Sequence, residues 1–263
     1  MLRPVPRRGS LARRRTIAAA ALVLAITALL VNARGTHPAS PHATRTAAAP
    51  IGSTSTSGAV VPSTTTTIVF GRGIPLDPSW PRTVTLVTDS VTLGAASALR
   101  SDLPGWNVQV LGKPALMINQ AVPLYLPPGR QVGSVVVVGL GYNSLWQKNR
   151  ANFAAWAAQF DREADSLVSQ LRTRGAKKIV WVTLREPSPS VVTANGEYQY
   201  EHYAWFFPYV NERLRALVHR QPDIALANWA AVSDRMNLTY DLIHLNPDGA
   251  RLMARVIVRA IKS

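Results

Sequence analysis

Three short motifs in this chain carry side chains that could act together in nucleophilic catalysis. The pair Asp89-Ser90 follows one apolar run, Asn143 follows another, and Asp241 lies shortly before His244. A serine hydroxyl is a weak nucleophile that needs a base to take its proton, and histidine most often serves as that base. A carboxylate behind the histidine ring fixes its tautomer and stabilises the imidazolium. These residues predict covalent catalysis by Ser90, with His244 as general base and Asp241 as the group that orients it.

Such a reaction also needs hydrogen-bond donors for the negative charge that develops on the acyl oxygen. The side-chain amide of Asn143 and the backbone N–H of Ser90 are the candidate donors, because both follow predicted strands. Removing one donor of this kind typically costs about 2.7–4 kcal/mol of transition-state stabilisation.

The elements that must position these motifs alternate between strands and helices. Strands are predicted at 83–87, 106–111, 131–139, 178–184 and 224–228, and helices at 93–101, 151–174, from after 202 to about 219, and 246–261. This alternation predicts an α/β protein, a three-layer α/β/α sandwich with a parallel sheet. Neighbouring parallel strands end at one crevice, where ligands bind, so the motifs are expected to converge there. Residues 68–70 are expected to form a small edge strand or a packing tail.

The order and spacing of the motifs resemble those of the SGNH, or GDSL-type, hydrolases over residues 81–263. The Gly-Asp-Ser block of that family corresponds to residues 88–90, its Gly-x-Asn-Asp block to 141–144, and its Asp-x-x-His block to 241–244. Each motif alone is weakly specific, whereas the three in this order are more so. The resemblance implies the flavodoxin-like SGNH hydrolase fold and no cofactor.

Within that family, the wording of residues 89–95 and 244–250 is most similar to the extracytoplasmic SGNH domains of peptidoglycan O-acetyltransferases. Those domains move acetyl groups onto or off cell-wall sugars. The resemblance implies a serine esterase or O-acyltransferase that forms an acyl-serine intermediate. The implied substrate is an acylated carbohydrate or another small ester, and a separate protein would supply the acyl group if the reaction is a transfer.

Three blocks depart from the family pattern. Thr88 stands where the first block has glycine, and Ser144 replaces the second acidic residue of the third block. The family's second block supplies a glycine N–H to the oxyanion hole. The corresponding region here is 117–120, which lacks glycine, so the backbone N–H of Asn119 is the expected third donor.

The N-terminal third has a composition unlike that of the predicted domain. Residues 1–15 are basic, 16–33 are apolar and uncharged, and 34–80 are rich in Ser, Thr, Pro and Ala. Basic residues before an apolar segment are typical of a signal anchor or a signal peptide, with the basic end in the cytoplasm. Residues 34–80 are expected to be a disordered tether, because such a composition buries too little apolar surface to offset chain entropy. The sequence therefore predicts an exported domain, membrane-anchored or secreted.

Charge and cysteine content exclude some functions and leave others open. The net charge is +15 and there is no cysteine, which excludes disulfides, thiolate metal sites and a cysteine nucleophile. Nucleic-acid binding is the alternative that the charge suggests. The densest basic cluster lies beside the apolar segment, so no nucleic-acid partner is expected. No metal is expected either. A second alternative is a non-catalytic module that retains the fold and binds the cell envelope.

Overall fold

The computed structural model describes residues 69–71, 73–144, 150–186, 197–234 and 236–263, all within the compact unit Pro62–Ser263. The predicted basic segment, the apolar segment and most of the tether lie outside the described residues. Side chains of the helix that begins at Glu197 are described from Phe206 onward.

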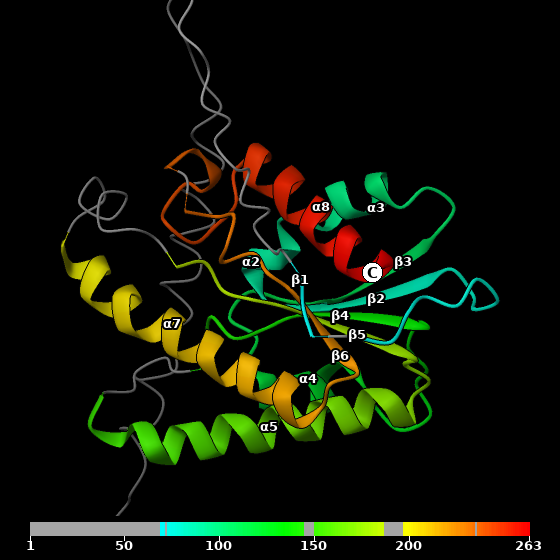
Figure 1. The fold of residues 1–263 in the computed structure, drawn as a ribbon, viewed down its shortest axis with the longest axis horizontal. Coiled ribbons are helices and arrows are strands. Elements are labelled where there is room, and N and C mark those ends of the chain that lie inside the picture. Colours follow the sequence, from blue (N-terminus) through cyan, green and yellow to red (C-terminus); the bar gives the residue numbers. More distant parts are fainter. Residues whose placement is uncertain (1–68, 72, 145–149, 187–196, 235) are drawn as a thin grey trace, which may run out of the picture. The chain divides into compact units, whose positions relative to one another are not determined.

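A six-stranded sheet forms the middle layer, and five of its strands are parallel (Figure 1). Across the sheet the order is β1-β6-β5-β4-β2-β3. The strands are β1 (Val69–Phe70), β2 (Thr83–Thr88), β3 (Asn107–Gly112), β4 (Val135–Gly139), β5 (Lys178–Val182) and β6 (Ile224–Ala227). The chain passes from β2 outward to β3 and then crosses back to β4 on the other side of β2. The strand order reverses at this point, and ligands of doubly wound α/β folds bind there.

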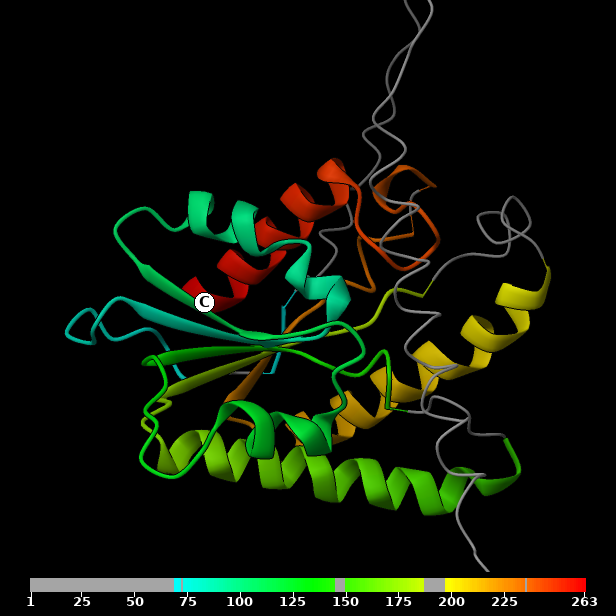
Figure 2. The ribbon, with the colours of Figure 1, turned by 180° about the vertical axis from the view of Figure 1, so that it is seen from behind.

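Helices cover both faces of the sheet (Figures 1 and 2). One face carries α2 (Ser90–Leu93), α3 (Ala96–Asp102) and α8 (Pro247–Lys262), and the other carries α4 (Ile118–Tyr125), α5 (Phe153–Thr173) and α7 (Glu197–Arg220). Two 3-10 turns, η1 (Arg150–Asn152) and η2 (Met236–Leu238), complete the described elements. The predicted three-layer α/β/α architecture is confirmed.

The central strands are buried on both faces because they lie between these helix layers. All residues of β4, β5 and β6 are buried, and Val135 to Val138 expose none of their surface. Unbroken β-branched runs suit such strands. This rigid sheet fixes the positions of the loops that follow its strands.

The structure differs from the sequence prediction at a few element boundaries. Residues 93–101 were expected to form one helix, but Gly94 ends α2 and α3 begins at Ala96. The helix after β5 begins at Glu197 and not after residue 202, so it takes in residues that were not expected to be helical. The short strand β1 pairs antiparallel with β6 at the edge of the sheet.

Candidate active site

Ser90 is the first residue of helix α2, one position after the aspartate that follows β2. Asp89 caps this helix, and its carboxylate accepts a hydrogen bond of 3.0 Å from the N–H of Val91. The first N–H groups of a helix have no intrahelical acceptor. The N–H of Ser90 therefore lacks an intrahelical acceptor, and its role as an oxyanion donor stays a prediction.

The loop between β6 and α8 brings the other two residues to this serine. Nε2 of His244 lies 3.1 Å from Oγ of Ser90, and Nδ1 of His244 lies 2.7 Å from Oδ2 of Asp241. The second oxygen of Asp241 accepts from the N–H of His244 at 2.7 Å and from that of Ile243 at 3.2 Å. One carboxylate thus shapes the turn and also orients the ring. The arrangement matches the geometry of a serine, base and carboxylate triad.

Hydrogen bonding within the turn shifts the pKa values of both dyad members. The hydrogen bond to Asp241 outweighs burial and raises the pKa of His244 above its ordinary value. Burial opposes ionisation of Asp241, but the hydrogen bonds from the side chain and backbone of His244 lower the pKa of that carboxyl overall. An ionised Asp241 beside a more basic imidazole favours proton removal from Ser90.

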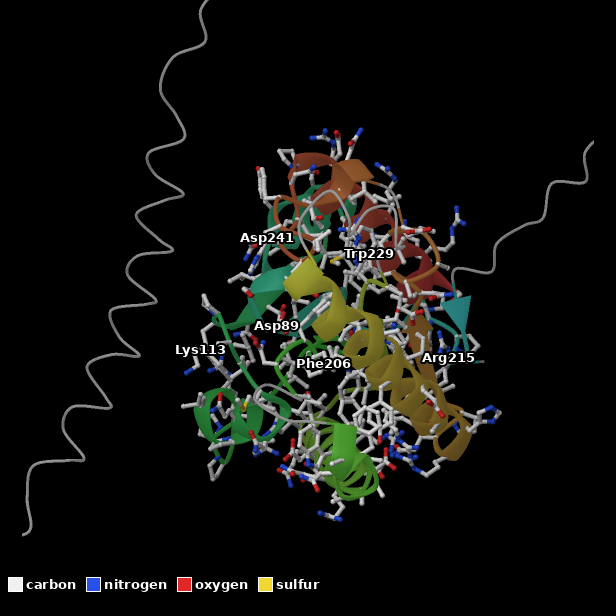
Figure 3. All side chains as sticks on the ribbon, turned by 90° about the vertical axis from the view of Figure 1, so that its left-hand side faces the viewer. Asp89, Lys113, Phe206, Arg215, Trp229 and Asp241 are labelled. Carbon is white, nitrogen blue, oxygen red and sulfur yellow. The ribbon has the colours of Figure 1, made fainter. Side chains whose placement is uncertain are left out.

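A second carboxylate, Asp89, lies completely buried beside the serine. Burial raises the pKa of Asp89 to about 7. Hydrogen bonds from Val91 and Asn143 favour the charged form and oppose this rise without cancelling it. Asn143 donates its side-chain amide to Asp89 at 3.3 Å and to the carbonyl of Leu116 at 3.5 Å. Figure 3 labels Asp89 and Asp241, which lie in the same half of the view. The contact with Asp89 places Asn143 beside the serine, and its role as an oxyanion donor stays a prediction.

The threonine that replaces the glycine of the first block fits because its neighbour on β3 is glycine. Thr88 is fully buried, and its hydroxyl donates to the carbonyl of Asp89 at 2.9 Å. Thr88 pairs with Gly112, and a Cβ at Gly112 would lie 2.7 Å from the side-chain carbon Cγ2 of Thr88. The glycine that the motif lacks on β2 therefore has a counterpart on β3.

The predicted third donor, Asn119, is the second residue of α4. Its side chain donates to Glu163 on α5 at 3.3 Å, away from the serine motif. Ala115, earlier in the same loop, has a φ of 57°, a backbone conformation that favours glycine. Its neighbour Leu116 contacts Asn143 through its carbonyl. Glycine-like backbone geometry thus occurs at Ala115, which no sequence signal marked. The role of the Asn119 N–H stays a prediction.

Two side chains in the neighbourhood were not recognised from the sequence. Arg185 is fully buried after β5, and its N–H donates to the hydroxyl of Tyr142 at 2.8 Å. Burial strongly raises the pKa of Tyr142, which keeps its phenol neutral. An arginine directly after a buried strand was the available signal.

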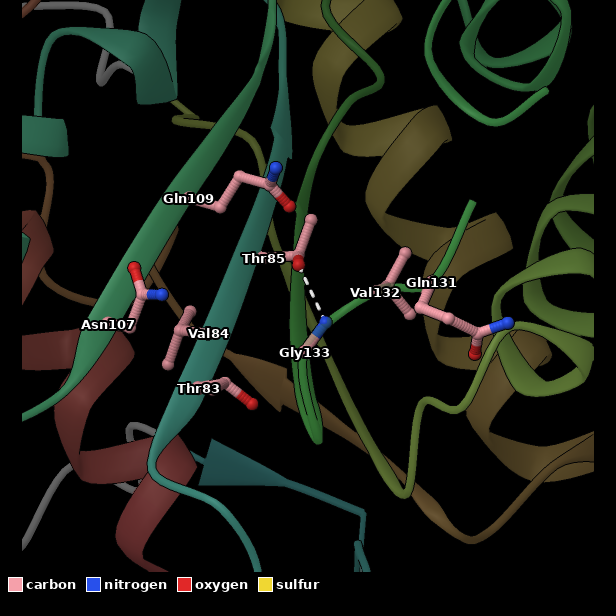
Figure 4. Close-up of a pocket in the computed structure, with 8 residues that line it drawn as sticks. All are labelled: Thr83, Val84, Thr85, Asn107, Gln109, Gln131, Val132 and Gly133. Carbon is pink, nitrogen blue, oxygen red and sulfur yellow. Dashed lines mark hydrogen bonds between the residues drawn. The ribbon is translucent and has the colours of Figure 1, made fainter. Parts of the chain in front are cut away.

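Two cavities of similar size lie away from the triad. One of about 370 Å³ opens at the amino-terminal end of β2 and β3, where Oγ1 of Thr85 accepts from the N–H of Gly133 at 2.8 Å (Figure 4). The other, of about 360 Å³, lies between α4 and α5 beside Asn119. Since Ser90 follows the carboxyl end of β2, the first cavity lies at the opposite end of that strand from the serine. Within the described residues there is no group of three metal-ligating side chains. No helix in the same part of the chain is long and apolar enough to cross a membrane.

Comparisons with known proteins identify the fold. No protein-family model matches the sequence, and no curated protein matches it. An acetyl xylan esterase structure shares 18% identity, with a TM-score of 0.53 over 68% of this chain and 99% of that chain. A putative acylhydrolase from Bacteroides fragilis shares 14% identity, with a TM-score of 0.52 over 72% and 90% of the two chains.

A third structure is the C-terminal catalytic domain of peptidoglycan O-acetyltransferase A from Streptococcus pneumoniae. It shares 23% identity over 70% of this chain and 94% of that chain, with a TM-score of 0.49. A putative GDSL-family lipolytic protein from Desulfitobacterium hafniense shares 10% identity over 68% of this chain and 99% of that chain, with a TM-score of 0.51. The chain has the α/β/α fold of the SGNH, or GDSL-type, hydrolases.

Proposed function

We propose that this protein is a serine esterase or O-acyltransferase that works through an acyl-Ser90 intermediate. The observation that carries the proposal is the continuous contact from Ser90 Oγ to His244 Nε2, and from His244 Nδ1 to Asp241. The position of Ser90 at the switch point of the sheet supports the same conclusion, since ligands of such folds bind there.

In the first half of the reaction, Oγ of Ser90 attacks the acyl carbonyl while Nε2 of His244 takes its proton. The resulting oxyanion accepts hydrogen bonds from the Ser90 N–H and the amide of Asn143, with the Asn119 N–H as the third proposed donor. The tetrahedral intermediate then collapses. The C–O bond to the leaving alcohol breaks, His244 returns its proton to that oxygen, and the acyl group remains on Ser90.

In the second half, a hydroxyl group removes the acyl group from the serine. His244 deprotonates either water, which gives hydrolysis, or a sugar hydroxyl, which gives transfer, and it then protonates the departing Ser90 oxygen. Both outcomes use the same residues. Acetyl esters of cell-envelope carbohydrate are the proposed substrates, on the basis of the motif resemblance and of a fold shared with an acetyl xylan esterase. No cofactor is assigned to these steps.

The proposed setting is outside the cytoplasm, with the domain either anchored to the membrane or released from it. This rests on the basic and apolar segments at 1–15 and 16–33. If the reaction is a transfer, we propose that a separate protein supplies the acyl group.

The proposal is tested by comparing wild type with Ser90→Ala on a small aryl acetate and with a fluorophosphonate probe. Wild type should turn over and be labelled, and an acetyl adduct on Ser90 should appear in the intact mass under rapid quenching. Ser90→Ala should lose all three signals. Ser101→Ala, at an exposed position on α3, is the matched control and should behave as wild type. Turnover that survives in Ser90→Ala would remove Ser90 from the mechanism.

A non-catalytic envelope-binding module is the second candidate, motivated by the altered first and second blocks. This candidate predicts binding to acetylated cell-wall glycan without turnover, and equal binding by wild type and Ser90→Ala. The same assays therefore decide between the two functions.

A further inference from the structure

The loop that carries His244 and Asp241 has little regular structure of its own. Between β6 and α8, the residues that the structure describes form η2 and one bridge between Thr239 and Leu245. Leu242, which lies between the two catalytic side chains, has a φ of 70°. A non-glycine residue in this region costs roughly 1–2 kcal/mol, so the surrounding structure must hold it there.

Arg185 supplies contacts that hold this loop from another element. Its Nε donates to the carbonyl of Ser233 at 2.7 Å, and its Nη1 donates to Oγ1 of Thr239 at 2.5 Å and to the carbonyl of Leu242 at 3.1 Å. The three acceptors span the loop from its first half to the residue after Asp241. The guanidinium is rigid and planar, so these contacts fix the loop in orientation as well as in distance.

The same residue is tied to the oxyanion side of the site. The backbone N–H of Arg185 donates to the hydroxyl of Tyr142 at 2.8 Å, and Tyr142 precedes Asn143 in the chain. The Tyr142 ring packs edge-on against Phe207 on α7, with ring centroids 4.9 Å apart. Through its backbone and its side chain, Arg185 therefore connects the segment that carries Asn143 with the loop that carries the base.

We propose that Arg185 is a positioning residue that holds the His244 loop at hydrogen-bonding distance from Ser90. This inference rests on the proposed serine mechanism, because it assigns Arg185 no contact with substrate. Arg185 follows β5, which is completely buried. The rigid sheet therefore fixes the position of Arg185, and Arg185 in turn fixes the position of His244. A displacement of about 1 Å in a catalytic group can cost roughly 100-fold in rate.

The test uses the full chain with Arg185→Met and Arg185→Lys, and Arg174→Lys as the matched control. Arg174 also donates its guanidinium to a backbone carbonyl, that of Leu126 at 2.7 Å, but it lies at the far end of α5. We expect Arg185→Met to lower kcat on an aryl acetate about 100-fold, with KM changed less than about threefold. Arg185→Lys should fall between Arg185→Met and wild type, because an ammonium cannot reproduce the planar fork. Arg174→Lys should stay within about twofold of wild type, since its change lies away from the site.

A second measurement separates positioning from general damage and from failure of the enzymatic proposal. Imidazole NMR titration of His244 needs no turnover. In Arg185→Met the pKa of His244 should move down toward its ordinary value, because the Asp241 contact that raises it is loosened. Arg174→Lys should leave the titration unchanged. If wild type has no esterase activity, the enzymatic proposal fails, and this titration still decides whether Arg185 positions the loop.

Thr239→Val covers the case in which Arg185→Met does not fold. This change removes one acceptor of the guanidinium while keeping Arg185 and the shape of the side chain. It should lower kcat by up to about tenfold, which corresponds to one charge-assisted hydrogen bond. The proposal is overturned if folded Arg185→Met, or Thr239→Val in its place, keeps wild-type kcat and the wild-type His244 titration.

Discussion

The buried Asp89 beside the proposed nucleophile should leave a distinct mark on the pH dependence of stability. Its pKa is raised from 3.8 to about 7 by burial, so the folded protein holds this proton more tightly than the unfolded chain. In the window between these two values the unfolded chain is ionised at this site and the folded protein is not. The free energy of unfolding contributed by Asp89 therefore falls as the pH rises through this window.

The magnitude follows from the shift. About three pH units at about 1.4 kcal/mol per unit give a loss of about 4 kcal/mol in the free energy of unfolding across the window. Asp89 exposes none of its surface, so solvent screening does not reduce this figure as it would at an exposed group. Asp89→Asn removes the titration and should lose this slope.

The assay is denaturant unfolding of wild type and Asp89→Asn between pH 4.5 and pH 6.5. This range avoids the other shifted groups of the site. His244 has a raised pKa, so its stabilisation is complete below 6.5 and is lost only above it. Asp241 has a lowered pKa, so its stabilisation is lost only as the pH falls below about 3.8. Wild type should lose up to about 3 kcal/mol relative to Asp89→Asn over this range.

Activity provides a second readout of the same substitution. The charge of Asp89 contributes to the raised pKa of His244. The acid limb of the kcat/KM profile of Asp89→Asn should therefore move to lower pH. The value of kcat should also fall. In wild type the side-chain NH2 of Asn143 donates to the carboxylate of Asp89, and in Asp89→Asn it would face the NH2 group of the new amide, which cannot accept a hydrogen bond. Asp102→Asn, at the exposed end of α3, is the control. Parallel stability curves for wild type and Asp89→Asn would refute the reasoning.

Three further substitutions test other parts of the site. Asp241→Asn should lower kcat by roughly 10³–10⁴-fold, because an amide cannot stabilise the imidazolium; a loss below tenfold in steady-state kinetics would contradict the assigned role. Gly249→Ala should lower the free energy of unfolding by about 2–3 kcal/mol in denaturant titrations, since the new Cβ would lie 1.9 Å from the carbonyl oxygen of Leu238. A loss in the free energy of unfolding of Gly249→Ala below about 0.5 kcal/mol would contradict the expected clash. At Ala115, thermal unfolding should rank the variants Gly, Ala and Val from most to least stable, because a positive φ disfavours β-branched side chains most; a stable Ala115→Val would contradict this ranking.

Much of the architecture was predictable because the buried strands have a strong local pattern. The valine run of β4 and the apolar run of β5 identify strands that are covered on both faces, and the alternation with helices then requires a parallel sheet. Topology placed Ser90 and His244 at the same edge of the sheet, since both lie in connections that follow the carboxyl ends of strands. The contact of 3.1 Å between them confirms that they are brought together.

The supporting contacts were not predictable from the sequence, because they depend on where distant backbone groups come to lie. Nothing near Arg185 in the chain indicates that its guanidinium will meet carbonyls of a loop about 50 residues later. The positive φ of Ala115 had no signal, since glycine is the usual mark of such a conformation. The contact between Asn143 and Asp89 likewise appears only when two strand ends are side by side.

The wide separation of the triad along the chain has a consequence for how activity first appears. Ser90 and His244 lie 154 residues apart, and His244 lies just before helix α8. During synthesis from the N-terminus, the serine is made long before its base exists. A partly synthesised chain that lacks His244 therefore has no activated nucleophile and should not react with esters around it. The onset of esterase activity would accordingly report that the domain has finished folding, since activity requires the segment that carries His244 and α8 to be docked on the sheet.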